Sequence, residues 1–449
     1  GGAGDGAPAL HELLLSLAES PSGGAVPPAR LHEIERSIAP TFAALPKNDA
    51  GRLTQRGARH LVHHYFAKEH GWLIAGLEPH GMRDDASQLH EIAILQAQVP
   101  ELVEDLVSLG YADSGFTLRD VTAMAALVER LLMNDAGTAL SRAYEFNGHA
   151  PDAALDEASL LEVVSSFLLL FHRNNDDIEA EEHLLFKELT RQDGEVYFSS
   201  LEDFGSDAVR SYVHARRGST NPFRPERFGF EAALEIVDGL LHRFGKWQHE
   251  DRRLMKEDLV LLDPHGTGLV PLARFHSHWS PRGFVFRESL EYMRQIGAVD
   301  ESAPGGPQVR IANYLLGPSN CMPSSSAHLS LCAISECEAL MSELETRLRA
   351  PAAPAEAILS VASGVSSSSV DAPRDLPEAL AARLMRIADR SAGSEVPLHG
   401  RLFAEWLHAA FPLECPYPHI AEDAVALTAG HFDHERHVLP EHAAAAAAA

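Results

Sequence analysis

The sequence predicts a mainly α-helical protein made of helical hairpins, with few and short strands. Apolar residues recur at the three- and four-residue spacing of a helix face in most segments of the chain. Strand-like runs are few and short. Stretches rich in Pro, Ala, Gly and Ser separate the helical segments, so helices joined by loops are expected.

The first part of the chain is expected to form short amphipathic helices followed by longer ones. A Gly/Pro/Ser linker separates the first two, and Thr117 or Ser114 is a candidate cap for residues 118–146, as one long helix or two. Residues 160–171 are apolar on nearly every side and should be buried. The predicted helices here cover residues 8–17, 28–45, 52–71, 88–109, 118–146 and 160–171.

The later part of the chain begins with a highly charged segment, residues 174–206. Its weak periodicity predicts a solvated helix followed by irregular chain around Asp193–Glu195. Helical spacing then returns, and the predicted helices cover residues 230–249, 251–262, 286–296, 329–348, 376–390 and 401–411.

Composition describes an acidic protein with ample material for a core. Hydrophobic residues make up 45% of the 449 residues, and 64 Asp and Glu outnumber 37 Lys and Arg, for a formal charge of -27. Such a surface repels phosphate backbones and anionic lipid heads. The composition therefore argues against nucleic acid as a partner.

Targeting information is expected to be missing from this chain. The longest apolar stretch, residues 163–171, is far shorter than the ~20 residues that cross a bilayer, so no membrane span is expected, although the protein could lie at the edge of a membrane complex. The chain begins at Gly1 without Met, which suits removal of a targeting peptide and predicts an organelle lumen or a secretory or extracellular location.

The clearest motif is a loop between two predicted helices, residues 263–274. Asp263 stands at its first position, Thr267 at the fifth, Gly268 at the sixth where the chain turns sharply, and Val270 at the eighth. Phe275 then opens the exiting helix. In this spacing the segment resembles a helix–loop–helix of the EF-hand superfamily.

The ligands that calcium needs are missing from this loop. A calcium-binding loop carries a bidentate carboxylate at position twelve, where this chain has Arg274, and His265 stands at position three. Only Asp263, Thr267 and the backbone carbonyl of Leu269 remain as oxygen ligands. We therefore expect a structural relic that binds no metal, and no cofactor is predicted.

Two further segments are weaker matches to the same pattern. Residues 395–403 repeat the Val-Pro-Leu of residues 270–272, with a small insertion. Residues 148–159 place Leu155 at the bridging position, with Asp156 capping the next helix. Since EF-hands usually come in pairs, the loop around Leu155 pairs with the one around Val270, or each has a partner that the sequence does not reveal.

The expected organisation follows from these motifs and from two linkers, residues 300–307 and 350–373. A length of 449 residues suggests about two to four units at roughly 100 to 200 residues each. The expected units are an N-terminal helical region (1–84), an EF-hand-like helical domain (85–305), a Cys-containing helical segment (306–349), a C-terminal helical domain with an EF-like loop (350–442) and a poly-Ala tail (443–449).

A second resemblance covers the chain from about Leu61 onward. It is carried by short motifs at residues 65–66, 70–72, 76–79, 313–314, 319–321, 335–338, 396–403 and 414–419. In these motifs the chain is similar to a set of proteins of dinoflagellates and related alveolates. The resemblance implies an origin and not a mechanism.

All four cysteines lie in the C-terminal part of the chain: Cys321, Cys332, Cys337 and Cys415. They permit two disulfides with three connectivities, which would imply an oxidising compartment, and buried free thiols are the alternative. Cys332 and Cys337, about 140° apart on a predicted helix, would bond more naturally to other segments than to each other.

Other chemistry at these cysteines has weaker support. A zinc site of Cys332, Cys337, Cys415 and His419 matches no compact finger spacing. A thiol hydrolase could use Cys321 with His399 or His419 as the base, but no local hydrolase signature is present. We therefore predict no catalytic residues.

Histidines form two groups whose spacing could bind a metal. His60 and His64 have the spacing to chelate a metal from one helix face, although a polar face is the simpler interpretation. The tail histidines, His431, His434, His437 and His442, could bind a transition metal adventitiously.

These observations favour a structural or protein-interaction subunit of a larger assembly, with other protein subunits as partners. Helical hairpins, ligand-poor loops and proline-rich connectors support that hypothesis. A calcium- or redox-responsive regulator is the first alternative, and a Cys-dependent hydrolase is the second.

Overall fold

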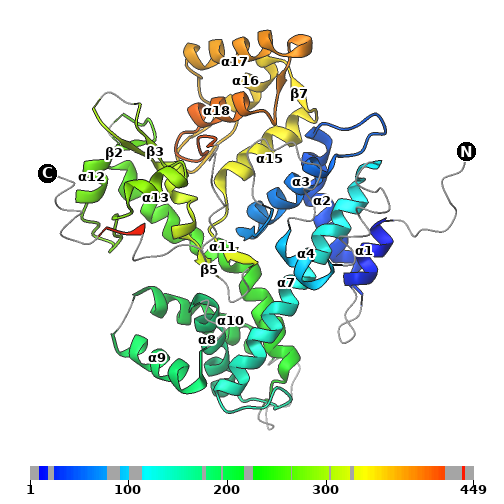
Figure 1. Cartoon of the computed structure of the whole chain (residues 1–449), viewed down its shortest axis with the longest axis vertical. Helices are drawn as coiled ribbons and strands as arrows, with labels where there is room; N and C mark the ends of the chain where they lie inside the picture. The colour runs from blue at the N-terminus through cyan, green and yellow to red at the C-terminus, as the bar shows by residue number, and fades with distance from the viewer. Residues whose placement is uncertain are drawn as a thin grey trace, which may run out of the picture.

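A computed structural model of the chain confirms the mainly α-helical class (Figure 1). It describes residues 10–18, 25–77, 92–100, 114–173, 178–193, 196–216, 226–263, 265–302, 305–323, 328–419 and 437–439. Within these ranges it has sixteen α-helices and eight strands of two or three residues. No helix in the described part of the chain is long and apolar enough to cross a membrane.

The N-terminal helices pack around one long helix, α7. Thr117 caps α7 through a capping box, in which Asp120 accepts a hydrogen bond from the Thr117 amide in return, and a single helix of 29 residues follows. The expected one-helix alternative and its Thr117 cap are therefore confirmed. The elements are α1 (Leu10–Ala18), α2 (Pro28–Ala44), α3 (Gln55–Glu69), α4 (Ala93–Gln98) and α7 (Leu118–Phe146).

The middle of the chain forms the lower bundle of Figure 1, from which α7 and α11 run up to the centre of the molecule. The two helices expected over residues 230–262 are one helix of 31 residues. The ion pairs of Arg253 with Glu250 and Glu257, three and four residues away, support the helix where we expected a break. The elements are α8 (Glu157–Arg173), α9 (Ala180–Asp193), α10 (Val196–Arg216) and α11 (Phe230–Val260).

A compact unit with a three-stranded sheet follows α11. Its strand order is β2-β4-β3, and the expected boundary between residues 305 and 306 falls between two paired strands. The elements are β2 (Leu269–Pro271), α12 (Leu272–Ser277), α13 (Leu290–Gln295), β3 (Val299–Asp300), β4 (Gln308–Arg310), α14 (Ile311–Leu315) and a 3-10 turn, η1 (Pro318–Asn320).

A second small sheet joins the chain after α3 to residues 322–331. Strand β6 (Leu329–Leu331) lies between β1 (Trp72–Ile74) and β5 (Met322–Pro323). The helix expected over residues 329–348 is therefore wrong in its first part. Leu329 and Leu331 are buried in this sheet, where pairing with β1 overrides the helical spacing.

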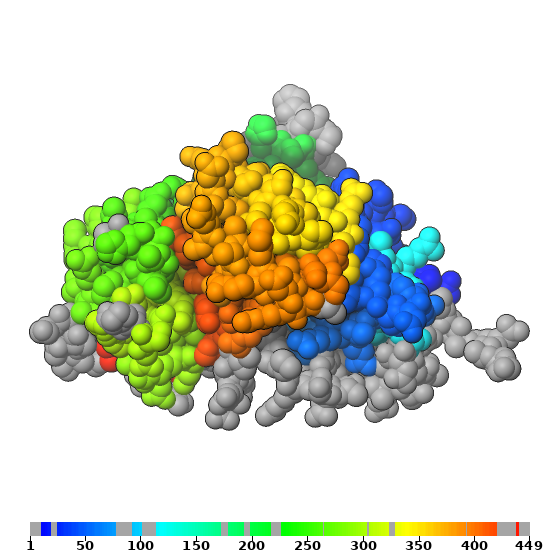
Figure 2. Space-filling model, turned by 90° about the horizontal axis from the view of Figure 1, so that it is seen from above, coloured from blue at the N-terminus to red at the C-terminus, as the bar shows by residue number. Residues whose placement is uncertain are grey.

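The C-terminal unit lies at the top of Figure 1. Seen from above, it sits between the N-terminal helices and the β2-β4-β3 unit (Figure 2). Its elements are α15 (Glu336–Leu348), β7 (Ala352–Ala353), α16 (Ala355–Ser363), α17 (Glu378–Arg390), η2 (Ala392–Ser394), β8 (Val396–Pro397) and α18 (Arg401–Ala410). Helix α15 also packs on α2 and α3, so this unit is fastened to the first helices of the chain.

The described residues form three hydrophobic cores. The largest contains α1 to α10, most of α11 and the β1-β6-β5 sheet. A second lies around Phe275 and Tyr314, and a third lies around Trp406 in the C-terminal unit.

One arrangement recurs along the whole chain. Four antiparallel backbone pairings each join two residues that lie shortly before a helix: Leu53 with Phe116, Leu155 with Phe228, Val270 with Val309, and Ala353 with Val396. A helix begins two residues after seven of these eight positions, namely α3, α7, α8, α11, α12, α14 and α16, while α18 begins five residues after Val396. Leu155 and Val270 thus have separate partners, as in the second expected alternative.

Candidate functional site

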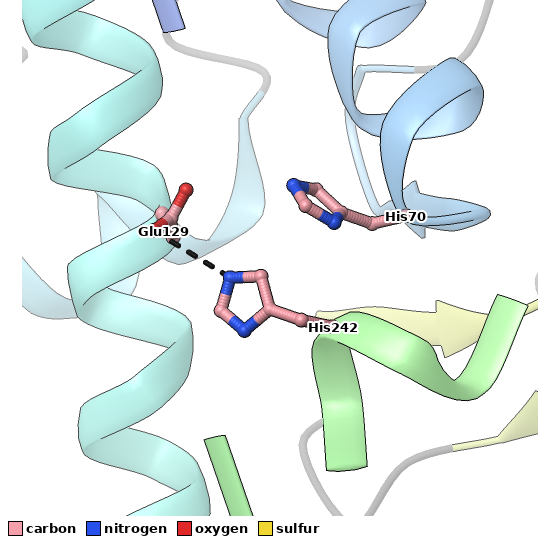
Figure 3. A group of neighbouring side chains, drawn as sticks. All are labelled: His70, Glu129 and His242. Atoms are coloured by element: carbon pink, nitrogen blue, oxygen red, sulfur yellow. Dashed lines mark ion pairs between the residues drawn. The ribbon is translucent and has the colours of Figure 1, made fainter. Parts of the chain in front are cut away.

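Three side chains with metal-binding chemistry meet where α3, α7 and α11 approach one another (Figure 3). His70 is the residue that ends α3, Glu129 lies within α7, and His242 lies on α11. Their candidate ligand atoms all lie within 4.8 Å of one another, and Nε2 of His242 is 3.6 Å from Oε1 of Glu129. The three residues come from segments far apart in the sequence.

Two glycines allow His70 to lie this close to α11. Gly71 has a φ of +68°, and a Cβ there would lie 2.1 Å from the carbonyl oxygen of Cys332. A Cβ on Gly245 of α11 would lie 2.3 Å from the carbonyl oxygen of His70. The backbone around His70 therefore packs directly against α11 and against the chain after β6.

Arg30 of α2 holds the carboxylate of Glu129 from the other side. Its Nε and Nη2 donate to Oε1 and Oε2 of Glu129 at 2.9 and 2.8 Å. Its Nη1 donates to Glu33 at 3.1 Å, and Nη2 lies 3.0 Å from the Tyr65 hydroxyl. The guanidinium thus orients Glu129 in a fixed plane.

The two imidazoles are oriented through their contacts with neighbouring groups. Nδ1 of His242 lies 2.8 Å from the carbonyl oxygen of Asp238, which can only accept, so Nδ1 carries a proton and Nε2 faces Glu129. Nε2 of His70 lies 3.4 Å from Nη2 of Arg30, which can only donate, so Nε2 is unprotonated and its lone pair faces Arg30. This tautomer assignment rests on the partners of each ring nitrogen.

Burial and neighbouring charges shift the pKa values of the three side chains in different directions. Burial lowers the pKa of His70 to about 3, so its imidazole is neutral. Burial alone would raise the pKa of Glu129, but the neighbouring His242 and the hydrogen bonds from Arg30 hold it down at about 2. Burial opposes the charge on His242, yet its contact with Glu129 raises the pKa. The cluster thus contains a carboxylate, a neutral imidazole and an imidazole that gains from a nearby negative charge.

A second buried polar cluster joins α3 to the C-terminal unit. His64 is bonded through Nδ1 to Glu338 of α15, and Nε2 of His399 lies 3.3 Å from Oε1 of Glu345. The rings of His60 and His399 are 5.4 Å apart. Thr41 of α2 donates to the other oxygen of Glu345.

The helix face that carries His60, His63 and His64 lies against the C-terminal unit. His63 and His64 are buried under α15, and His60 is half-buried against His399. The ring centroids of His60 and His64 are 6.3 Å apart, and Nδ1 of His64 is bonded to Glu338. The histidines therefore take part in packing between α3 and α15.

The loop predicted to be a degenerate calcium site keeps its turn through Asp263. The carboxylate accepts from the amide of His265 and the hydroxyl of Thr267, both at 3.2 Å, and from the amide of Gly268 at 2.6 Å. Gly268 has a φ of +75°. Leu269 lies in β2, and Arg274 is exposed on α12. The carboxylate of Asp263 therefore serves the loop backbone.

The four cysteines form two disulfides, Cys321–Cys332 and Cys337–Cys415. Cys332 lies after β6 and outside the helix predicted for it, because that segment pairs with β1. All four sulfurs are bonded, so the thiol needed for the zinc site and for the hydrolase is not available in this state. His419 packs against Gly297.

A buried lysine lies beside the second disulfide. Nζ of Lys256 donates to Glu336 at 3.0 Å, to Glu414 at 2.9 Å and to Ser368 at 2.7 Å. Glu336 and Glu414 precede Cys337 and Cys415 in the chain. The disulfide and this ion-pair network thus fix the end of α11 and both ends of the C-terminal unit at one point.

Sequence reasoning did not identify the His70, Glu129 and His242 cluster. These residues share no local spacing, and His70 was noticed only within a motif of the second resemblance. Of the tail histidines, only His437 is described, and its carbonyl oxygen accepts from the amide of Ser289 at 2.7 Å. The other three, His431, His434 and His442, lie outside the described residues.

Comparison with known proteins gives no relative from which a role could be carried over: no family model, curated protein or solved structure matches this chain.

Proposed function

We propose that this chain is a structural or protein-interaction subunit, built from four tandem pairs of EF-hand-like units that do not bind calcium. The recurring backbone pairs, each followed by a helix, carry this proposal. In an EF-hand pair the eighth loop positions meet in such a bridge, and the exiting helix starts directly after it. The repeat therefore extends the likeness first noticed at Asp263 to the whole chain.

The residues at the calcium-critical position argue against metal binding in these loops. Position twelve of a calcium loop, four residues after the bridging residue, carries a bidentate Glu. The eight corresponding residues are Gly57, Asp120, Ser159, Ala232, Arg274, Asn313, Ala357 and Gly400. The one carboxylate among them, on Asp120, accepts from the amide and the hydroxyl of Thr117 at 2.8 and 2.6 Å.

Fixed connections between the units favour a static role over a calcium-driven opening. The Lys256 network ties the C-terminal unit to α11, and the Cys337–Cys415 disulfide joins α15 to the chain after α18 within that unit. The contacts of α15 with α2 and α3 tie the same unit to the N-terminal helices. Two disulfides also favour an oxidising compartment, such as an organelle lumen or the secretory space.

Three exposed apolar side chains near the end of α11 and after α12 support the interaction role. The side chains of Leu261, Trp279 and Val285 are 77%, 80% and 58% exposed. The Ser280 hydroxyl, next to Trp279 in the chain, donates to the buried Asp258 of α11. Exposed Trp is enriched at protein interfaces, where its large area contributes much of the binding energy.

Native-mass analysis of gently solubilised source material tests this proposal. We expect the chain to migrate in a stable assembly well above its own 48.8 kDa, with protein partners identified in the same fraction. Migration as a lone chain would contradict it. Trp279→Ser should weaken the assembly, whereas Leu185→Ser, at an exposed leucine of α9, is the matched control.

A redox-responsive regulator is the second candidate, favoured by the position of the Cys337–Cys415 disulfide between α15 and the chain after α18. In that case mild reduction would release the assembled partner while leaving the helical content unchanged. A subunit with purely structural disulfides would keep its partner until it unfolds.

A further inference from the structure

We propose that His70, Glu129 and His242 bind one divalent transition-metal ion of the zinc class. The proposal concerns a site separate from the ligand-poor loops described above, and it does not depend on the role proposed for the chain. It rests on the convergence of three ligand side chains from three helices and on the groups that already orient them.

The donor set selects the class of ion. Two imidazoles and one carboxylate are the ligands of many zinc sites, and imidazole also suits copper, nickel and iron. Calcium and magnesium prefer sets made of oxygen atoms. The cluster is therefore suited to zinc and its neighbours in the first transition row.

The geometry is close to what such an ion needs. Ligand atoms at about 2.0 Å from a tetrahedral ion lie about 3.3 Å from one another. The nitrogen of His242 and the oxygen of Glu129 are 3.6 Å apart, and no pair of candidate atoms exceeds 4.8 Å. The widest separation must therefore shorten by at most about 1.5 Å for the three atoms to share one ion.

Neighbouring groups hold the ligands as outer-shell partners do in metal sites. Metal-bound histidines usually donate their other N–H to a carbonyl or carboxylate, which fixes the tautomer. Nδ1 of His242 makes this contact with the carbonyl of Asp238 at 2.8 Å, and the Asp238 carboxylate lies 3.4 Å away. Arg30 plays the corresponding part for Glu129 through its two hydrogen bonds.

The positive charge of Arg30 is the main opposing factor. Its Nη2 lies 3.4 Å from Nε2 of His70, so it occupies part of the space in front of that nitrogen. Glu33 pairs with the same guanidinium at 3.1 Å, which offsets part of its charge. A carboxylate oxygen has two lone pairs, so Glu129 can keep its bonds to Arg30 while binding the ion.

Three protein ligands leave a fourth position for water or a small anion. The Tyr65 hydroxyl, 3.4 Å from Nε2 of His70, is a polar group close to the ligand atoms. An open fourth position distinguishes zinc sites that bind small ligands from closed structural sites with four protein ligands. The site is thus expected to accept an exchangeable anion such as cyanide or azide.

Metal titration of the full-length chain tests the proposal. The protein is freed of metal with a chelator and titrated with Zn²⁺ against a chromophoric indicator, and separately with Co²⁺ followed by visible absorption. We expect one ion per chain that competes with the indicator. Intense Co²⁺ bands typical of four-coordination should appear and should shift on addition of azide.

Variants locate the ion. His242→Ala and Glu129→Gln should each lower Zn²⁺ affinity by at least about 100-fold. The second keeps the size of the side chain, and circular dichroism checks that both remain folded. The matched control replaces the tail histidines 431, 434, 437 and 442 by Ala together, and it should bind with unchanged affinity.

Three results would overturn the proposal. The first is that the wild type does not compete with the indicator for Zn²⁺. The second is that only the tail variant loses Zn²⁺ binding. The third is that His242→Ala and Glu129→Gln are folded and bind Zn²⁺ with unchanged affinity. In each of them the cluster is an ion-pair network that needs no metal. The assembly test with Trp279→Ser is unaffected by any of these results.

Discussion

Lys256 and Glu414 form an ion pair of 2.9 Å, buried beside the Cys337–Cys415 disulfide. Burial raises the pKa of Glu414, but the neighbouring Lys256 ammonium outweighs it and keeps the pKa below its usual range. Because Lys256 also reaches Glu336, two carboxylates that the fold places at the disulfide share one ammonium. The ion pairs of Lys256 therefore fasten α11 to the C-terminal unit at the place where the disulfide joins α15 to the chain after α18.

Replacing Lys256 by Met should loosen the C-terminal unit strongly. The change leaves Glu336 and Glu414 without their shared cation, and breaking a buried pair in this way costs about 3–5 kcal/mol. Amide hydrogen exchange should show lost protection in α15 and α18. Lys246→Met, at an exposed position of the same helix, is the control and should leave exchange unchanged.

Gly245→Ala should destabilise the protein, whereas Gly239→Ala should not. A Cβ at 245 would lie 2.3 Å from the carbonyl oxygen of His70, so backbone must move, at a cost of about 1–3 kcal/mol. At 239 the nearest heavy atom is 4.0 Å away, and Ala favours the helix by about 0.5–1 kcal/mol. Denaturant midpoints of the two variants compare packing with helix propensity directly. Equal denaturant midpoints for the two variants would contradict the close approach of Gly245 to the carbonyl oxygen of His70.

Local signals in the sequence predicted much of this fold. The cap at Thr117 and the helical spacing after it were sufficient to place α7 within one residue, because capping and amphipathicity act over neighbouring residues. The turn at Asp263 could also be predicted from the sequence, since its carboxylate accepts from amides within five residues.

Contacts between distant segments were not predictable in the same way. Residues 329–331 have helical spacing but form a strand because Trp72–Ile74 lies beside them. The His70, Glu129 and His242 cluster depends on the crossing of three helices, which no local spacing records. The partners of Leu155 and Val270 could not be identified for a different reason. The segments before Phe228 and Val309 lack the loop residues that mark a calcium site.

Acid should weaken the contact between α3 and α15. Burial lowers the pKa of His60 to about 3 and that of His399 to about 4, and burial also lowers the pKa of His63. Below pH 6.5 the unfolded chain therefore binds protons that the folded contact excludes. Stability falls as the pH drops from 6.5 toward these values, by at most about 1.4 kcal/mol per pH unit for each histidine.

Other charged groups at this contact modify the acid response without reversing it. Burial opposes the charge on His64, but Glu338 raises its pKa, so the stability from this pair is lost as the pH rises from the usual histidine value, near 6.5, through that raised value. Burial favours protonation of Glu338, but His64 holds its pKa at about 2; its contribution is therefore lost only as the pH falls from its usual value, near 4.5, toward 2. Glu345, Lys68 and Arg59 are the remaining charged groups there.

Hydrogen exchange of α15 between pH 7 and pH 4.5, corrected for intrinsic rates, measures this response. His399→Gln removes one titrating group and should flatten the pH dependence. His214→Gln, at an exposed histidine of α10, should leave it unchanged. A contact that becomes more stable as the pH falls through 6 would contradict the assigned pKa directions.

The two disulfides should contribute unequally to stability. Loop-closure entropy depends on the length of the loop, which is 78 residues for Cys337–Cys415 and 11 for Cys321–Cys332. The corresponding stabilisation is about 4.5 and about 3 kcal/mol. The variant with Ser at 337 and 415 should melt below the one with Ser at 321 and 332. The reverse order would mean that native contacts outweigh the chain entropy.

Calcium should not stabilise the wild-type chain, but His265→Asp with Arg274→Glu should create a site. Asp263 and Gly268 already shape the loop, and the two changes supply the missing carboxylates at positions three and twelve. At a hundredfold excess over its dissociation constant, calcium would stabilise the double variant by about 2.7 kcal/mol, measured as a rise in melting temperature over a chelator control. Adding Asp263→Asn should abolish the rise. A calcium-dependent rise in the melting temperature of the wild type would show that residues other than the eight at position twelve of the loops bind the ion. It would also remove the main support for a calcium-independent subunit.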